Sequence, residues 1–315
     1  MDCFVGFDTS NYTTSAAVCS LDGEVIANIK APLPVKDGAC GLRQSDAVFA
    51  HIKNIPAVTA QLREAIAPHR VLAVGCSARP RDAQDSYMPC FLSGVAAAHS
   101  FASALGVPLY DFSHQSGHVM AAIYSAGVSS EMMQQRFAAF HVSGGTTEML
   151  LIDPRKDGFD VELVGGTEDL NAGQAIDRIG VMMGLSFPCG KEIERLAEEN
   201  ERKLPRSRVS VREGRCNLSG LQNIAERLWA ETADPAAVSA YTLAFIGDTL
   251  CEMTRQLDAS FGELPIIYAG GVMSNLYLQK RLAERRNTYF ALPQYSADNA
   301  AGVSLLCRLK YLSAD

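Results

Sequence analysis

No apolar run in the 315-residue sequence approaches the roughly 20 residues that a helix needs to cross a bilayer. Residues 1 to 8 carry no basic segment of the kind that opens a secretory signal, and they lead directly into an apolar stretch. The sequence contains no low-complexity segment and no long linker. These absences argue against a membrane protein, and we expect a folded cytoplasmic protein.

Paired cysteines are also missing, although cysteine itself is not rare. The nine cysteines are scattered singly, and no two of them form the Cys-x-x-Cys pair that is typical of redox motifs and many zinc sites. The spacing therefore does not favour a disulfide framework. We expect buried, reduced thiols, as in proteins of reducing compartments.

Positive charge is scarce, because 28 Lys and Arg residues face 35 Asp and Glu residues and the formal net charge is −7. A protein that coats nucleic acid with its whole surface needs Lys and Arg to neutralise phosphates. RNA binding would therefore require a local basic patch or a partner protein. The stretch from residue 201 to 215, which we interpret as a polar loop, is either such a patch or an ordinary solvated loop. Its basic residues are Arg202, Lys203, Arg206, Arg208, Arg212 and Arg215.

The sequence predicts a group of strands followed by alternating helices and strands, and this layout occurs twice along the chain. Apolar runs predict strands at 3–7, 15–19 and 25–29, helices at 48–67 and 91–104, and strands at 71–76 and 107–111. A similar plan begins again at 137, with strands at 137–142, 149–152, 159–164 and 265–268 among helices. We therefore predict an α/β protein with lobes at 1–130 and 131–315, the second with a helical insertion.

Two histidines carry the sharpest chemical signal. His114 and His118 are spaced i and i+4 on a predicted helix that Ser113 would cap, so their rings can share one metal ion. Such a pair can equally hydrogen-bond backbone carbonyls where a helix start is packed. Asp298, which we predict to open the final helix, could supply a third ligand, although an acid is common in a first helical turn.

Three small-residue turns directly follow predicted strands. Backbone N–H groups in such turns can approach a phosphate or a ribose, although a Gly-Gly after a strand is often only a structural turn. Asp177, in the helix that starts near 172, could accept a ribose hydroxyl or be a solvated carboxylate. The turns are Asp8-Thr9-Ser10, Ser143-Gly144-Gly145 and Ala269-Gly270-Gly271.

A series of motifs runs through nearly the whole chain: His114-x-x-x-His118, His141-Val142-Ser143-Gly144-Gly145, Ala172-Gly173-x-Ala175-x-Asp177, Leu218-Ser219-Gly220-Leu221, Ala269-Gly270-Gly271-Val272-x-x-Asn275 and Asp298-Asn299-Ala300. In order and spacing this series resembles the TsaD family, the tRNA threonylcarbamoyladenosine transferases once classed as glycoproteases. The resemblance implies an actin-like fold of two ribonuclease-H-like lobes with a nucleotide cleft between them. It also implies one divalent metal ion, iron or zinc, on His114, His118 and Asp298. The adenylate or ATP contacts it implies are Val142, Ser143, Gly144, Gly145, Asp177, Gly190 and Asn275.

The implied reaction moves a threonylcarbamoyl group from threonylcarbamoyl-AMP to N6 of adenosine 37 in tRNAs that read ANN codons. A mixed anhydride is already activated, so such an enzyme needs mainly positioning and a Lewis acid. TsaB-like and TsaE-like partner proteins are implied as well. The residues show no Ser-His-Asp arrangement, and the histidine pair lacks the Glu of the H-E-x-x-H peptidases, because positions 115 and 116 are Gln and Ser.

Several positions depart from the family pattern around the expected acyl phosphate. Where the family has an acidic run after Thr9-Ser10, this chain has Asn11 to Thr14, and where the family has Gly-Pro-Gly, it has Ala78 to Arg81. Thr146 stands in place of a His and Gln174 in place of a Glu. Lys191 stands in place of the last Pro of a Pro-Gly-Gly-Pro turn. Arg79, Arg81 and Lys191 would make the cleft more positive if they point inward. These changes are consistent with a divergent paralogue that acts on another acceptor. A non-catalytic scaffold of the tRNA-modifying complex is a further alternative, but it is disfavoured because such scaffolds generally lack the histidine pair that this chain keeps.

Overall fold

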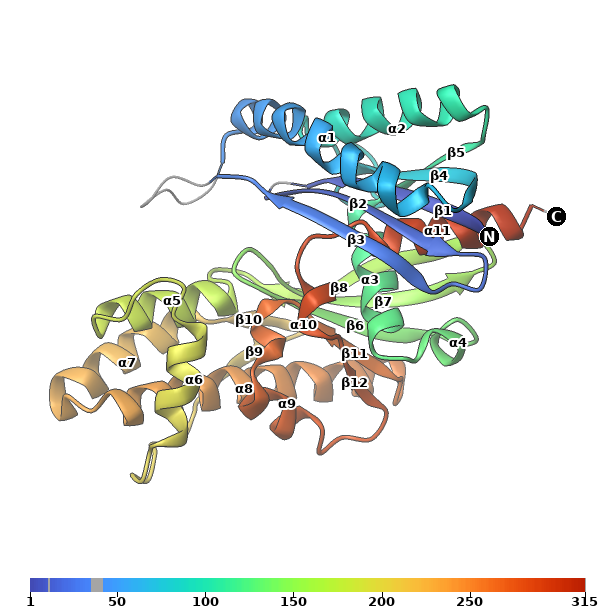
Figure 1. Ribbon diagram of the computed structural model, residues 1–315. Coiled ribbons are helices and arrows are strands. Elements are labelled where there is room, and N and C mark those ends of the chain that lie inside the picture. The colour runs from blue at the N-terminus through green and yellow to red at the C-terminus, as the bar shows by residue number, and fades with distance from the viewer. Residues whose placement is uncertain (11, 35–41, 315) are drawn as a thin grey trace. The chain divides into compact units, whose positions relative to one another are not determined.

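The computed structural model describes residues 1–10, 12–34 and 42–314 (Figure 1). Within them the chain forms two compact units, and each unit is built from stretches that are separate in the sequence. Unit 1 contains Met1–Gln134, Asp153–Val161 and Gln294–Asp315, and unit 2 contains Gln135–Ile152 and Glu162–Pro293. Each unit contains a sheet with helices, so the predicted α/β class is confirmed.

The sheet of unit 1 has the strand order β3-β2-β1-β4-β5. Its strands are β1 (Asp2–Thr9), β2 (Thr13–Ser20), β3 (Val25–Pro32), β4 (Arg70–Arg79) and β5 (Leu109–Ser113). The first three run antiparallel, as the predicted meander requires, and β4 and β5 run parallel to β1. Because β1 lies at the centre, both of its faces are buried.

Helices cover the two faces of that sheet. The helices α1 (Gln44–Ile66) and α2 (Phe91–Leu105) pack on the face of Cys3, Val5 and Phe7. The opposite face is met by α11 (Ala301–Leu312), where Phe4 contacts Tyr311. Side chains alternate along a strand, so Asp8 falls on the α11 side. Unit 1 also holds α3 (His114–Ser125) and the short α4 (Ser129–Met132).

The second sheet has the order β12-β11-β6-β7-β8-β10-β9. Its strands are β6 (Phe137–Val142), β7 (Thr147–Arg155), β8 (Gly158–Thr167), β9 (Ser210–Arg212), β10 (Arg215–Asn217), β11 (Ile266–Ala269) and β12 (Thr288–Phe290). β11 pairs parallel with β6, while β7 pairs antiparallel with it. The predicted polar loop at 201–215 is thus partly wrong, because its end forms the β9–β10 hairpin.

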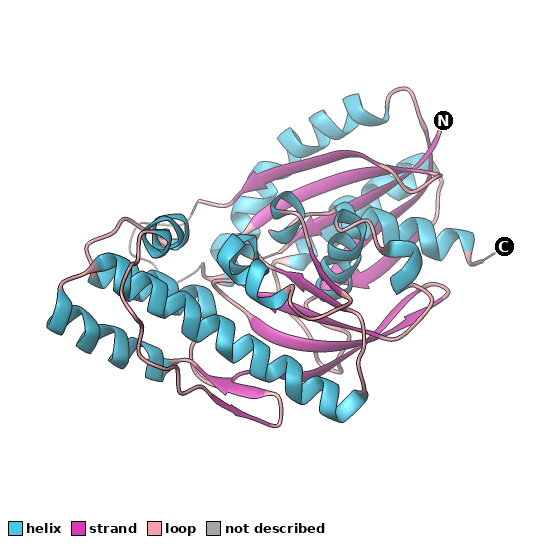
Figure 2. Cartoon of the chain, turned by 90° about the horizontal axis from the view of Figure 1, so that it is seen from below, coloured by secondary structure: helices cyan, strands magenta, loops and turns pink. Residues whose placement is uncertain are grey.

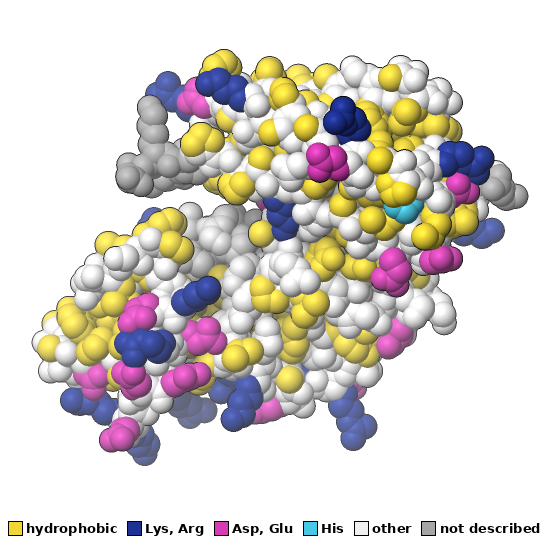
Figure 3. Space-filling model, viewed as in Figure 1, with side chains coloured by type: hydrophobic (Ala, Val, Ile, Leu, Met, Phe, Trp, Pro, Cys, Tyr) yellow, Lys and Arg dark blue, Asp and Glu magenta, His cyan; other side chains and the backbone are white. Residues whose placement is uncertain are grey.

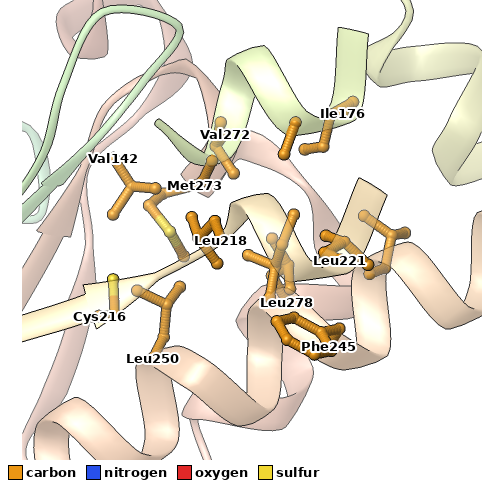
Figure 4. Packing of buried hydrophobic residues seen from close by; sticks show 14 of the residues in the cluster. Val142, Ile176, Cys216, Leu218, Leu221, Phe245, Leu250, Val272, Met273 and Leu278 are labelled. Carbon is orange, nitrogen blue, oxygen red and sulfur yellow. The ribbon is translucent and has the colours of Figure 1, made fainter. Parts of the chain in front are cut away.

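Helices of unit 2 pack around a continuous apolar core. They are α5 (Ala172–Met182), α6 (Gly190–Glu198), α7 (Ser219–Thr232), α8 (Pro235–Phe261) and α9 (Leu276–Leu282), with a 3-10 turn at Gly271–Ser274; α10 (Pro293–Ser296) follows at the unit boundary. Figure 2 shows the helices and strands of the described chain from below. In Figure 4, Val142 and Val272 lie near Leu218, and Phe245 and Leu278 complete the packing.

Eight of the nine cysteines are described, and all eight are free thiols. Seven of them are buried and Cys251 is partly exposed, as the scattered spacing predicted; Cys40 lies outside the described residues. Burial raises the pKa of the Cys19 thiol to about 12, so this sulfur stays protonated at neutral pH.

Even the longest helix of the described residues, α8 with 27 residues, lacks the apolar character that crossing a membrane requires.

Candidate metal and nucleotide sites

The amino-terminal end of α3 holds the two histidines in place. As predicted, the Ser113 side chain caps the helix by accepting a hydrogen bond from the Ser116 amide at 3.0 Å. The Asp82 carboxylate accepts further hydrogen bonds from the Ser113 and Ser116 hydroxyls at 2.6 and 2.8 Å. With the helix start fixed, the His114 and His118 rings lie 4.3 Å apart and their Nε2 atoms are 2.9 Å apart.

Asp298 brings its carboxylate to both histidines from the segment before α11. Its Oδ1 lies 3.5 Å from His114 Nε2 and 3.3 Å from His118 Nε2. The helix itself begins at Ala301, so the prediction that Asp298 opens it is wrong by three residues. Asp298 instead lies in the bend before the helix, where the Asn299 Oδ1 accepts from the Ala301 amide at 3.0 Å.

Glycines make this convergence possible, because α3 and α11 meet backbone to backbone. A Cβ on Gly302 would lie 1.8 Å from the Gly117 carbonyl oxygen. On the other side of α11, a Cβ on Gly6 of β1 would lie 2.5 Å from the Ser304 amide nitrogen. Only glycine permits such close approach. The three glycines therefore bring β1, α3 and α11, and the functional side chains on them, to one place.

Asp8 contacts His114 at Nδ1, the ring nitrogen that does not face His118 and Asp298. Its side chain is 0% exposed, and its Oδ1 lies 2.8 Å from His114 Nδ1, while the buried Oδ2 has no hydrogen-bond partner. This contact holds the His114 ring so that Nε2 faces His118 and Asp298. We expected Asp8 among the phosphate or ribose contacts, and no local pattern predicted its contact with His114, because the two residues are 106 positions apart. The adjoining Thr9 and Ser10 are buried too.

The donor atoms fit one divalent cation. Ligand atoms of His114, His118 and Asp298 all lie within 4.8 Å of one another. Nitrogen and oxygen donors held about 2.1 Å from a tetrahedral ion are about 3.4 Å apart, close to the distances seen here. Two neutral imidazoles and a carboxylate also suit zinc or iron.

The charges of the site also favour a cation. Burial alone would raise the pKa of the Asp298 carboxyl, but hydrogen bonds from His114 and His118 hold it well below its usual range. Burial disfavours a charged His114, yet the Asp8 and Asp298 carboxylates outweigh it and raise the pKa of His114 to about 10. Two carboxylates around one histidine thus favour a positive charge at this point.

The second group of predicted residues gathers in unit 2, where β6 and β11 end side by side. Ala269 is the partner of His141, so the turns that follow these two parallel strands lie at the same edge of the sheet. Gly270 has φ of 101°, and a Cβ there would lie 2.2 Å from the Val142 carbonyl oxygen. Gly144, Gly145 and Gly271 have open space around them and are exposed. The Gly145 amide already donates to the Ser143 hydroxyl at 3.2 Å, which leaves Gly144 and Gly271 as the exposed backbone available to a ligand at this edge.

The start of α5 packs against the same edge. Gly173 donates its amide to the Ser143 carbonyl at 3.1 Å, and a Cβ on Gly173 would lie 2.7 Å from Gly144. Asn171 and Gln174 form a capping box, in which Gln serves at the third helical position as Glu would. The small residues of this motif therefore fix the shape of the 143–145 turn.

Asp177, Gly190 and Asn275 have structural partners of their own. Asp177 Oδ1 accepts from the Cys189 amide at 2.8 Å, next to Gly190, the first residue of α6. Burial raises the pKa of Asp177 even though this hydrogen bond lowers it. The buried Asn275 side chain caps α9 by accepting from the Leu278 amide at 3.0 Å. Contact of these three residues with a nucleotide stays a prediction.

The substituted positions differ in what they do. Arg79 is neutralised, because it binds Asp82 and Asp111, each at 2.7 Å. That arginine therefore adds little free positive charge to its surroundings, whereas Lys191 is exposed. Asn11, the first of the altered run after Ser10, lies outside the described residues.

Comparison with known proteins places these features in a family. Residues 46–305 match the family model TsaD, tRNA N6-adenosine threonylcarbamoyltransferase. The chain is 29% identical over 318 residues to the tRNA N6-adenosine threonylcarbamoyltransferase of Streptococcus suis (strain 05ZYH33), which covers 98% of this chain and 92% of the relative. It is also 29% identical over 287 residues to that of Streptococcus pneumoniae (strain Taiwan19F-14), which covers 89% of this chain and 82% of the relative.

Solved structures agree on the fold. HypF of T. kodakarensis has a TM-score of 0.63 at 12% identity, over 99% of this chain and 48% of that one. The (R)-2-hydroxyglutaryl-CoA dehydratase component A of Acidaminococcus fermentans has a TM-score of 0.56 at 12% identity, over 100% of both chains. At this identity the likeness concerns the fold alone, and it confirms the actin-like class.

Proposed function

Because this chain belongs to the tRNA N6-adenosine threonylcarbamoyltransferase family, and is thus an acyltransferase, we propose that it modifies adenosine 37 of tRNAs that read ANN codons. The donor is threonylcarbamoyl-AMP, and the new bond joins its carbamoyl carbon to N6 of the adenine, with AMP as leaving group. The observation that carries the proposal is the meeting of His114, His118 and Asp298 in a chain that matches the family over most of its length.

In this proposal His114, His118 and Asp298 hold one divalent ion, iron or zinc. Such an ion, when bound, supplies a Lewis acid for the acyl phosphate. Asp8 keeps the His114 ring turned toward the ion through the 2.8 Å contact with Nδ1. Asp82 keeps the start of the helix fixed, so the ligands need no rearrangement.

The adenylate, or ATP, is bound by unit 2 in this proposal. Exposed backbone at Gly144 and Gly271 offers N–H groups to phosphate oxygens, and Asp177 has one carboxylate oxygen left for a ribose hydroxyl. The closeness of Gly270 to Val142 and of Gly173 to Gly144 supports this role, because both keep the turns in one shape.

Partner proteins resembling TsaB and TsaE are part of the proposal. An apolar hollow of about 680 Å³ lies between α1 and α2 of unit 1. Phe49, Ile52 and Leu92 beside it are 60%, 57% and 52% exposed. In Figure 3 hydrophobic side chains are visible over this part of unit 1. Large exposed apolar side chains of this kind are typical of surfaces that a partner covers.

A second candidate is a transferase of the same kind with another acceptor. It is favoured by one observation: the segment that replaces the Gly-Pro-Gly turn is tied through Asp82 to the start of α3, beside His114. A purely scaffolding role would not require the three convergent ligands.

The test is a reconstituted reaction with purified chain, threonine, bicarbonate, ATP, the enzyme that makes the adenylate, the partner proteins and an ANN-reading tRNA. Mass spectrometry should find threonylcarbamoyladenosine at position 37, and the Asp298→Ala variant should lose it. Modification of a different acceptor, with none on tRNA, would favour the second candidate. Activity that is unaffected by Asp298→Ala would argue against the metal site.

A further inference from the structure

The β9–β10 hairpin of unit 2 carries two arginines that are not neutralised. Arg212 and Arg215 are direct partners across the two strands, and both are exposed. Between them Glu213 and Gly214 have φ of 51° and 74°, which gives the tight two-residue turn of a hairpin. Within the described part of the chain neither arginine has an acidic partner.

Such an arrangement is unfavourable unless an anion is bound. Side chains directly opposite each other on antiparallel strands have Cβ atoms about 5 Å apart, and like charges there repel. Two guanidinium groups at that spacing can bind one phosphate, or two successive phosphates, with paired N–H groups. The hairpin therefore has the chemistry of a phosphate-binding surface.

The hairpin is held firmly. Gln256 of α8 accepts from the Gly214 amide at 2.9 Å and donates to the Val211 carbonyl at 3.1 Å. Its amide also donates to Glu252 at 2.8 Å, which ties the hairpin to the neighbouring turn of α8. The backbone that carries the two arginines is thus held in place, so no backbone ordering is needed when a ligand binds.

A polar hollow of about 460 Å³ lies against the same part of α8 and is lined by three more arginines. Arg255 pairs with Glu252, and Arg281 pairs with Asp248, but Arg206 has no acidic partner in the described chain. The Nε of Arg281 is buried there without a hydrogen-bond partner. The hollow therefore extends the positive surface beyond the hairpin.

Charge distinguishes this surface from the rest of the chain. Residues 201–217 contain six basic and two acidic side chains, in a protein whose net charge is −7. Figure 3 shows both signs intermixed over the visible face, as expected for a protein without a general affinity for nucleic acid. We propose that Arg206, Arg212 and Arg215 form a docking surface for the sugar-phosphate backbone of tRNA, an inference that rests on the proposed function.

The experiment measures binding of a fluorescent ANN-reading tRNA to the full chain at several salt concentrations. Removing two phosphate contacts with Arg212→Gln/Arg215→Gln should lower the slope of log Kd against log salt by about 1.6. Between about 50 and 200 mM salt the wild type should then lose about tenfold more affinity than the variant. The matched control, Arg70→Gln/Arg195→Gln, removes two exposed arginines that are paired with acids and should keep the wild-type slope.

The outcomes separate this inference from the proposed function. A tRNA slope that is the same in the wild type and the hairpin variant, while threonylcarbamoyl transfer is observed, overturns the docking surface alone. Failure of the wild-type chain to bind tRNA also overturns the docking surface, whereas the proposed function is overturned only if the reconstituted reaction with partner proteins modifies no tRNA. If the hairpin variant loses a protein partner but keeps its tRNA slope, the surface serves a protein and the inference is wrong. The melting temperature of the variant should not fall, because both side chains are exposed.

Discussion

Gly302→Ala offers the sharpest test of how the metal ligands are brought together. The added methyl would lie 1.8 Å from the Gly117 carbonyl oxygen, whereas ordinary contact begins near 3.4 Å. The two helices must therefore separate by about 1.5 Å, or distort, which typically costs about 1–3 kcal/mol in a packed interior. We expect the free energy of unfolding to fall by about that amount.

The same displacement should affect metal binding more than it affects stability. Asp298 lies only three residues before α11 and would move with it, whereas metal–ligand distances tolerate about 0.2 Å. Losing a partner that merely orients a ligand lowers metal affinity about 10–100-fold, so displacing a ligand itself should cost at least about 100-fold. Competition with a chromophoric chelator measures zinc affinity, and urea unfolding measures stability.

The matched control is Gly220→Ala in α7, where a Cβ would meet nothing within 4 Å. The same substitution there should leave metal affinity unchanged and stabilise the chain by about 0.4–1 kcal/mol, because alanine restricts the unfolded state. If Gly302→Ala binds zinc as tightly as the wild type, the account of the α3–α11 crossing is refuted.

Three further predictions follow from single contacts. Asp8→Asn should weaken zinc binding about 10–100-fold and change the His114 tautomer seen by nitrogen NMR, with the fold intact; unchanged affinity would show that Asp8 does not orient the ring. Gly270→Ala, whose methyl would meet the Val142 carbonyl at 2.2 Å, should weaken ATP binding measured by calorimetry, whereas Gly271→Ala, with nothing within 4 Å, should not; equal effects would contradict the role of the turn. His51, fully buried between Thr14 and Ser10, should lose its stabilising effect in acid. Burial lowers its pKa from the usual 6.5, so the neutral ring contributes stability above that pH and the contribution falls as the unfolded chain takes up protons below it. The melting temperatures of wild type and His51→Gln should therefore converge between pH 7 and 5, and a constant gap would count against this reasoning.

Local patterns were enough to predict most of the elements. Short apolar runs located β1, β2 and β3, and the strand at Phe137–Val142 was predicted to the residue. The Ser113 cap could be read directly, because a cap depends on neighbours in the chain. The β9–β10 hairpin was missed, since its strands have three residues each and its turn, Glu213-Gly214, lacks the usual Asn or Asp.

The sequence by itself determined the α/β class, the histidine pair on one helix face and, through the series of motifs, the family. The same series of motifs implied Asp298 as the third ligand, whereas only the tertiary structure placed Asp8 against the His114 ring. Asp8 and Asp298 are 290 residues apart in the numbering of the chain, and no periodicity links them. They meet at His114 because Gly6, Gly117 and Gly302 let a strand and two helices approach to backbone contact, and such non-local packing leaves no signal within a short window of sequence.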